Sequence, residues 1–171
     1  MLTAIQEFLN PEEGTIVSRS EWLDWDTPGT FGKVLWSINA PGGFGNGIYV
    51  SNEPNTTATG IFIQGGGTIQ AFETISVDNS DGSTPDLTPQ FLGVAYKEND
   101  VAFSFGFGSI STDTSATIPD LKTDGRFVIG NNAWGSFTGG SNHLNPANCH
   151  IKSFSYYSKR LTNAQLQTLL K

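Results

Sequence analysis

Residues 148–171 read NCHIKSFSYYSKRLTNAQLQTLLK, and this C-terminal stretch has the clearest local pattern in the chain. Thr162 is followed three residues later by Gln165, the spacing of a capping box, in which side chains pair with backbone groups at the start of a helix. Apolar residues then recur at helical spacing: Ala164, Leu166, Leu169 and Leu170. Because a helix of about two turns is marginal in water by itself, the pattern predicts a short helix that packs on a sheet.

The residues just before this helix have the alternation of a strand, with one interruption. Phe154 and Tyr156 are in phase, whereas Ile151 is one residue out of phase. An extra residue in one strand of a pair produces such a shift, so the pattern predicts a bulge near Lys152 or Ser153. We expect this strand to lie at an edge or a bend of its sheet.

The rest of the chain consists of short strand-like runs with turn signals about every 8–12 residues, which is typical of an antiparallel sandwich or jelly roll. Residues 90–105 give the strongest hairpin, in which Leu92, Val94 and Tyr96 share one face. The other predicted strands are 15–22, 33–38, 48–50, 60–64, 68–77 and 126–130. The sequence therefore predicts an all-β, antiparallel two-sheet β-sandwich with one short C-terminal helix, in a single domain over residues 1–171.

Composition and charge narrow the classes of partner. The formal net charge is −7, with only nine Lys and Arg residues, which disfavours a groove for nucleic acid and docking on anionic membranes. No apolar run approaches eighteen residues, and the N-terminus lacks the features of a signal peptide. Cys149 is the single cysteine, so no internal disulfide or zinc-type cluster is expected, and we predict that it is a small buried hydrophobe.

Four stretches together resemble the concanavalin A-like lectin/glucanase superfamily, in the laminin-G-like form of tailed-bacteriophage virion proteins. They are FLGVAYKENDVAFSF (91–105), STDTSATIP (111–119), RFVIG (126–130) and HIKSFSYYSKRLTNAQLQTLL (150–170). The last is the most specific, since an aromatic pair at Tyr156 and Tyr157 leads into the helix start. The resemblance implies a lectin-like jelly roll of two stacked sheets, made in the host cytoplasm and located on the virion surface. It does not establish a ligand, because function resides in sites added to a fold.

Glucanases of this superfamily use paired carboxylates on one strand, and the nearest match here is Glu21, Asp24 and Asp26. Glu21 and Asp26 would point to opposite faces of a continuous strand. Asp24 and Asp26 could share a face, but the following Thr-Pro-Gly indicates that the strand has already ended. We therefore predict no catalytic residue, with a polysaccharide-cleaving glycanase as an alternative.

Two loops carry the candidate binding residues. One mixes a tryptophan with amides and a histidine, as sugar binding requires: Asn131, Asn132, Trp134, Asn142, His143 and Asn145. The competing interpretation is that Trp134 covers the core while the asparagines cap turns. The other loop has oxygen ligands suited to Ca²⁺, namely Asp78, Asn79, Asp81 and Asp86, although the same residues are common in ordinary solvated turns. No other cofactor is predicted.

We expect a non-enzymatic structural protein on the surface of a tailed-phage virion, either a head decoration protein or a small tail component. Its partners would be other capsid or tail subunits and host-surface polysaccharide. The alternative is the receptor-binding tip of a tail fibre, although no coiled-coil or collagen-like shaft is found. Phe44 and Phe107, each between glycines, are the candidates for subunit contacts in a homo-oligomer.

Overall fold

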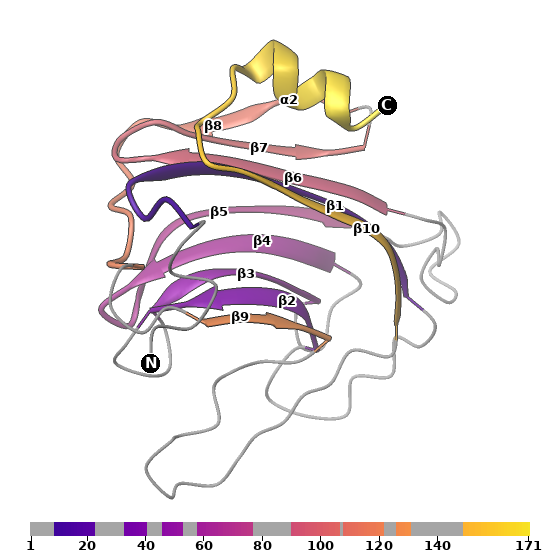
Figure 1. Ribbon diagram of the computed structural model, residues 1–171, viewed down its shortest axis with the longest axis horizontal. Helices are drawn as coiled ribbons and strands as arrows, with labels where there is room; N and C mark the ends of the chain where they lie inside the picture. The colour runs from indigo at the N-terminus through magenta and orange to yellow at the C-terminus, as the bar shows by residue number, and fades with distance from the viewer. Residues whose placement is uncertain are drawn as a thin grey trace, which may run out of the picture.

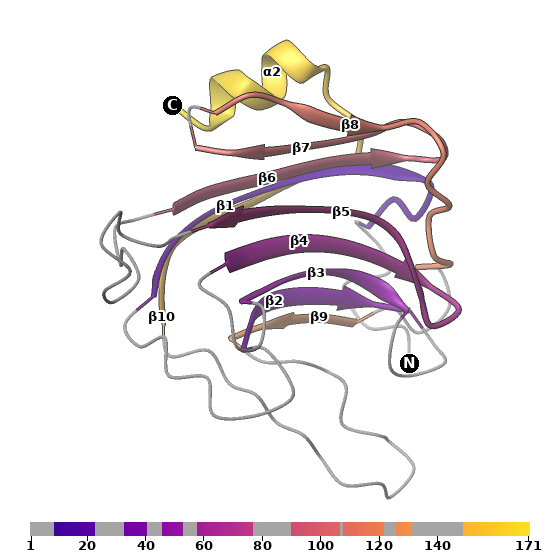
Figure 2. The ribbon, with the colours of Figure 1, turned by 180° about the vertical axis from the view of Figure 1, so that it is seen from behind.

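The computed structural model describes residues 9–22, 33–40, 46–52, 58–76, 90–106, 108–121, 126–130 and 149–171, which form two stacked antiparallel sheets of five strands each (Figures 1 and 2). Sheet A contains, in spatial order, β10 (Cys149–Tyr157), β1 (Glu13–Trp22), β6 (Gln90–Lys97), β7 (Val101–Phe105) and β8 (Ser111–Asp113). Sheet B contains β5 (Thr68–Ser76), β4 (Ala58–Gly65), β3 (Gly47–Asn52), β2 (Val34–Asn39) and β9 (Arg126–Ile129). The predicted fold class is confirmed.

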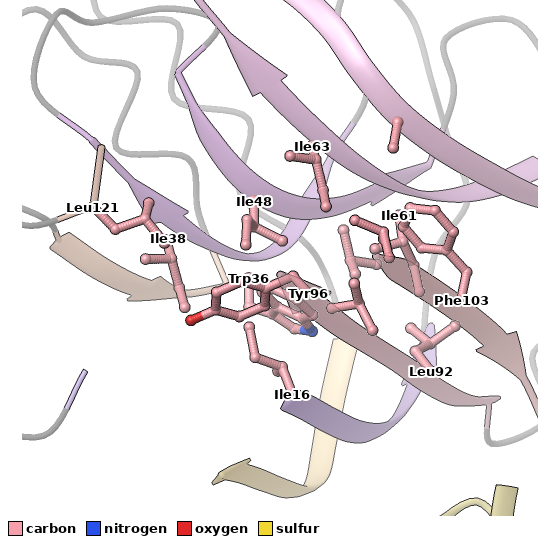
Figure 3. Packing of buried hydrophobic residues seen from close by; sticks show 14 of the residues in the cluster. Ile16, Trp36, Ile38, Ile48, Ile61, Ile63, Leu92, Tyr96, Phe103 and Leu121 are labelled. Carbon is pink, nitrogen blue, oxygen red and sulfur yellow. The ribbon is translucent and has the colours of Figure 1, made fainter. Parts of the chain in front are cut away.

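The core lies between the sheets because alternate residues of each strand point inward. Figure 3 shows Ile48 and Ile63 of sheet B pointing toward Tyr96 of sheet A. In the predicted hairpin, β6 and β7 are joined at a turn where Asn99 has a φ of 56°. The inward residues of that hairpin are almost fully buried: Leu92, Val94, Tyr96, Val101 and Phe103.

Strand β10 is an edge strand of sheet A, as predicted, and it pairs with β1. Arg19 pairs with Ser153 and Ser20 pairs with Ile151, so Lys152 has no partner in the register. This irregularity is the predicted bulge. It brings Ile151 back to the inner face, where it packs against the core.

Helix α2 (Asn163–Leu169) begins with the predicted capping box, in which Gln165 N–H donates to Thr162 Oγ1 and Thr162 N–H donates to Gln165 Oε1. The helix lies over the outer face of sheet A, beside β6 and β7 (Figures 1 and 2). Leu166 and Leu170 are fully buried there. Ala164 was expected in the same apolar stripe but is exposed, because the contact is made by the leucine pair. In the described parts of the chain, no helix is long and apolar enough to cross a membrane.

One end of the sandwich, which we call the loop end, carries most of the long connections. Segments 23–32, 53–57, 77–89 and 131–148 are flanked by described residues that all lie there (Figures 1 and 2). The strand pairing supports this placement. Trp22 at the end of β1 pairs with Cys149 at the start of β10 in sheet A, and Asn52 at the end of β3 pairs with Thr59 near the start of β4 in sheet B. The predicted sugar and calcium loops are therefore attached at one end of the molecule.

Candidate functional site

Four inward-facing polar side chains form a layer inside the sandwich at the loop end, and we call them the polar layer. Ser20 and Gln90 are register partners in sheet A, and Asn52 and Thr59 are register partners in sheet B. Ser20, Asn52 and Thr59 are completely buried. Each of the four continues the inward alternation of its strand. The inward positions farther from the loop end are apolar, with the exception of Ser18 on β1.

A hydrogen bond between the sheets locates this layer. Trp36 Nε1–H donates to Ser18 Oγ over 2.9 Å, and both side chains are fully buried. Ser20 follows Ser18 by two residues, and Asn52 follows Val50, the register partner of Trp36, by two residues. Because two residues of a strand span about 7 Å, the polar layer lies one step beyond the Trp36–Ser18 bond in both sheets.

Every member of the polar layer has a buried atom without a hydrogen-bond partner. These atoms are Ser20 Oγ, Gln90 Oε1, Asn52 Nδ2 and Thr59 Oγ1. Asn52 Oδ1 is satisfied, because it accepts from the backbone N–H of Lys33. An unsatisfied buried polar group costs about 1–3 kcal/mol, and the polar layer contains four of the six unpartnered buried side-chain atoms of the described residues, the other two being Gln64 Oε1 and Ser104 Oγ.

A second feature lies on the outer face of sheet B, where three aromatic rings stack across neighbouring strands. Tyr49 of β3 pairs with Phe62 of β4, which pairs with Phe72 of β5. The ring centroids are 5.1 Å apart for Tyr49–Phe62 and 6.1 Å apart for Phe62–Phe72, with interplanar angles of 17° and 7°. Any Cβ at Gly60 would collide with the Phe62 ring, so this glycine makes room for the stack. We call the three rings the aromatic ladder.

Exposure changes sharply along the aromatic ladder. Tyr49 and Phe62 are 8% and 7% exposed, whereas Phe72 is 56% exposed at the edge of the sheet. Polar side chains lie on the same face. Ser37 is the register partner of Tyr49 and accepts a 2.8 Å hydrogen bond from Asn39 Nδ2, and Gln64 has an unpartnered buried Oε1. These polar side chains are almost fully buried, so the exposed part of the aromatic ladder is the Phe72 ring, and an exposed aromatic ring can hold the apolar face of a sugar.

The residues predicted to bind a ligand lie outside the described residues, and they remain predictions. They are Asn131, Asn132, Trp134, Asn142, His143 and Asn145 for glycan, and Asp78, Asn79, Asp81 and Asp86 for calcium. Phe44 and Phe107 also lie outside the described residues. Among the residues that the structure describes, no group of three or more His, Cys, Asp or Glu side chains is placed to hold a metal ion.

The carboxylates of the glucanase interpretation are only partly described. Strand β1 ends at Trp22, and both Asp24 and Asp26 fall in a segment outside the described residues. Glu21 Oε2 lies 2.9 Å from Lys152 Nζ, and this hydrogen bond and ion pair hold the pKa of the Glu21 carboxyl below its ordinary value. Cys149 was predicted to be buried, but it is only partly buried, packed against the core, and this burial raises the pKa of the thiol.

The sequence interpretation missed both described features. The aromatic ladder was signalled only by the alternation of GIYVSN, ATGIFIQG and TIQAFETIS, which puts one aromatic residue of each strand in the phase opposite to the core. Which three strands are neighbours could not be read from that alternation. The polar layer has no signal in the sequence, since its members come from four strands of two sheets.

No protein-family model matches the sequence, and no curated protein matches it significantly. Among solved structures, the CBM40 domain of Ruminococcus gnavus IT-sialidase bound to α2,3-sialyllactose is similar, with a TM-score of 0.64 and 12% identity over 98% of this chain and 85% of that one. The chain has a CBM40-like fold. The NanB sialidase of Streptococcus pneumoniae has a TM-score of 0.66 and 15% identity over 96% of this chain, which corresponds to 25% of that enzyme.

The leech intramolecular trans-sialidase is also similar, with a TM-score of 0.65 and 12% identity over 94% of this chain and 23% of that one. At these identities the likeness establishes the CBM40-like β-sandwich and does not identify a ligand. The lectin-like sandwich implied by the sequence resemblance is therefore confirmed. Membership of the concanavalin A-like superfamily and the phage origin remain predictions.

Proposed function

We propose that this CBM40-like sandwich is a non-catalytic glycan-binding module whose ligand rests on the outer face of sheet B, against the ring of Phe72. The observation that carries the proposal is the aromatic ladder, which ends in a ring that is 56% exposed. The apolar face of a pyranose ring fits an exposed aromatic ring. The stack behind Phe72 holds its ring in a fixed plane, which lowers the entropy lost on binding.

The similar solved structures support a sugar as the ligand. Two of them are structures of Ruminococcus gnavus IT-sialidase CBM40, one bound to α2,3-sialyllactose and one to α2,6-sialyllactose. Sialylated and neutral glycans are therefore the first two classes to compare. With a net charge of −7, the chain would repel a carboxylate at long range, so we expect neutral glycans to bind at least as well as sialylated ones.

A glycan array followed by isothermal titration of each hit tests this proposal. Phe72→Ala should weaken binding of a hit at least about ten-fold, which corresponds to about 1.4 kcal/mol. Ile129→Ala is the matched control, because Ile129 is 51% exposed on the opposite edge strand of the same sheet. An array without hits, or equal affinity of wild type and Phe72→Ala for every hit, would contradict the proposal.

We also propose that the module belongs to a structural subunit on the surface of a tailed-phage virion, with capsid or tail proteins as partners. The support is the resemblance carried by residues 91–105 and 150–170. Mass spectrometry of purified particles and the position of the gene beside capsid or tail genes test this assignment, and the same gene order separates a decoration protein from a fibre tip. Release of reducing sugar from a polysaccharide, lost in Asp24→Asn, would instead favour the glycanase alternative.

A further inference from the structure

We infer that a pocket at the end of the sandwich opposite the loop end is the docking site for a basic peptide segment of a partner protein. The pocket has a volume of about 380 Å³ and is lined by three separate segments of the chain: Pro11 and Glu12, Lys97 and Glu98, and Ile118 to Asp120. Strand β6 begins at the loop end, so its last residue, Lys97, lies at the far end of the sandwich. The inference does not depend on the glycan proposal, because the aromatic ladder lies on the outer face of sheet B.

Hydrogen bonds between the segments and the sheets hold the walls of the pocket in place. The carbonyl oxygen of Asn10, just before the first segment, accepts a 3.0 Å hydrogen bond from the hydroxyl of the buried Tyr96. In the third segment, Ile118 N–H donates to Glu98 Oε2 over 3.0 Å. This segment belongs to the connection that runs from β8 toward sheet B at this end of the sandwich (Figures 1 and 2). A pocket with ordered walls loses little entropy when a ligand binds.

The apolar part of the lining suits the hydrocarbon stem of a long side chain. Pro11 and Ile118 are partly buried and Pro119 is buried, and all three line the pocket without filling it. Ile118 also packs against the core, which fixes its position. The stems of lysine and arginine are apolar, whereas their ends are charged. A side chain of either type can therefore lie along the apolar lining and extend its charge to the rim.

The charges at the rim select the sign of the partner. Glu12, Glu98 and Asp120 are exposed acidic residues, and Lys97 is the only basic residue in the lining. Together they give the pocket a net negative charge, in a chain whose formal net charge is −7. A cationic segment is therefore attracted at long range and at the pocket itself, whereas a second copy of this acidic chain is repelled. Among the described residues the carboxylates are not grouped to hold a metal ion, so they suit an extended organic cation.

Peptide binding to the full chain tests the inference. Short fluorescent peptides with arginine or lysine between glycines are titrated by fluorescence anisotropy, beside matched peptides with glutamate or glutamine in place of the basic residue. We expect only the basic peptides to bind, and to shift the NMR amide signals of Glu98 and Ile118. Added salt should weaken the binding, because the charges at the rim are exposed to solvent.

Three substitutions distinguish the pocket from the general acidity of the chain. Glu98→Gln keeps an oxygen acceptor for Ile118 N–H but removes the charge, and it should weaken binding about three- to five-fold. Glu73→Gln is the matched control, because it removes the same charge from β5 of sheet B, and it should leave the affinity unchanged. Lys97→Gln removes a repelling charge from the rim and should tighten binding about two- to five-fold. Thermal melts establish that each variant is folded.

Other results would overturn the inference. If no peptide binds, or if acidic and neutral peptides bind as tightly as basic ones, a basic segment is not the occupant. Equal losses in Glu98→Gln and Glu73→Gln, or no gain in Lys97→Gln, would mean that only the overall charge attracts the peptides. Amide shifts at Glu98 and Ile118 that appear with protein concentration alone would assign the pocket to a second copy. Phe72→Ala should leave peptide affinity unchanged, so failure of the glycan proposal would not affect this result.

Discussion

Trp36 and Ser18 join the two sheets through a 2.9 Å hydrogen bond from the indole Nε1–H to the serine Oγ. Trp36 lies on β2 and Ser18 on β1, so the bond crosses the interior of the sandwich. Trp36 is the largest fully buried side chain among the described residues, and this bond satisfies its one polar atom in an apolar core. It also fixes how the two sheets are aligned along the direction of their strands. Because of this alignment, the polar-layer residues of sheet A and sheet B lie at the same distance from the loop end.

Ser18→Ala should destabilise the protein by about 1–3 kcal/mol, because the buried indole N–H loses its partner. Urea denaturation followed by circular dichroism measures the change. Ser155→Ala is the control, since Ser155 is exposed on the edge strand β10, and its effect should stay within about 0.5 kcal/mol. Equal unfolding free energies for both variants would show that the hydrogen bond contributes nothing.

Gly93→Ala should loosen the docking of α2. A Cβ at this position would lie 2.8 Å from Leu166 Cδ1 and 2.9 Å from Leu170 Cδ1, so the helix must shift, at a cost of about 1–3 kcal/mol. Gly65→Ala is the control, because its Cβ would make an ordinary 3.5 Å contact with Gln70 Cγ. Adding Leu170→Ala to Gly93→Ala should recover part of the loss, and strict additivity of the two changes would refute the clash.

Thr162→Ala should lower stability by about 1 kcal/mol, since it removes the capping hydroxyl of α2. Hydrogen exchange of the amides of Gln165 and Leu166 is the local readout, because Gln165 N–H donates to the threonine hydroxyl. Thr162→Ser keeps that acceptor and should exchange like wild type. Faster exchange in both variants would mean that packing of the threonine methyl group, not capping, holds the helix start.

The carboxyl of Glu21 should titrate below its ordinary pKa, because Lys152 hydrogen-bonds to it and carries the opposite charge. A group whose pKa is lowered by folding contributes stability above its unfolded pKa, and this contribution is lost as the pH falls through the lowered value. NMR titration of the side-chain carboxyl measures the shift. Lys152→Met should move the pKa back toward the ordinary range, and high salt should reduce the shift in wild type.

The parts of the fold that could be predicted from sequence were those encoded by neighbouring residues. The capping box of Thr162 and Gln165 and the phase break before Phe154 are local patterns, and the structure contains both the helix and the bulge they predicted. The hairpin of β6 and β7 is likewise a local pairing. Exposure of Ala164 was not predictable, because it depends on which face of the helix sheet A covers.

The candidate sites depend on pairings between distant strands, and these have no local signature. Phe62 and Phe72 are near in sequence, but Tyr49 joins them only because β3 pairs with β4. The polar layer requires Ser20 and Asn52 to face each other from different sheets, which the sequence does not specify. The predicted binding loops rest on composition alone, and the structure adds that their flanking strands end together.

The pairing of β10 with β1 also sets an order in which the fold can be completed. Strand β1 is synthesised before β10, and one of its hydrogen-bonding edges has no partner until β10 has been synthesised. Until β10 has been made, the backbone of β1 can therefore pair only with β6, along its other edge. An incomplete chain that lacks β10 presents an open strand edge, which is a template for aggregation, so premature termination should yield insoluble product in place of a smaller folded sandwich.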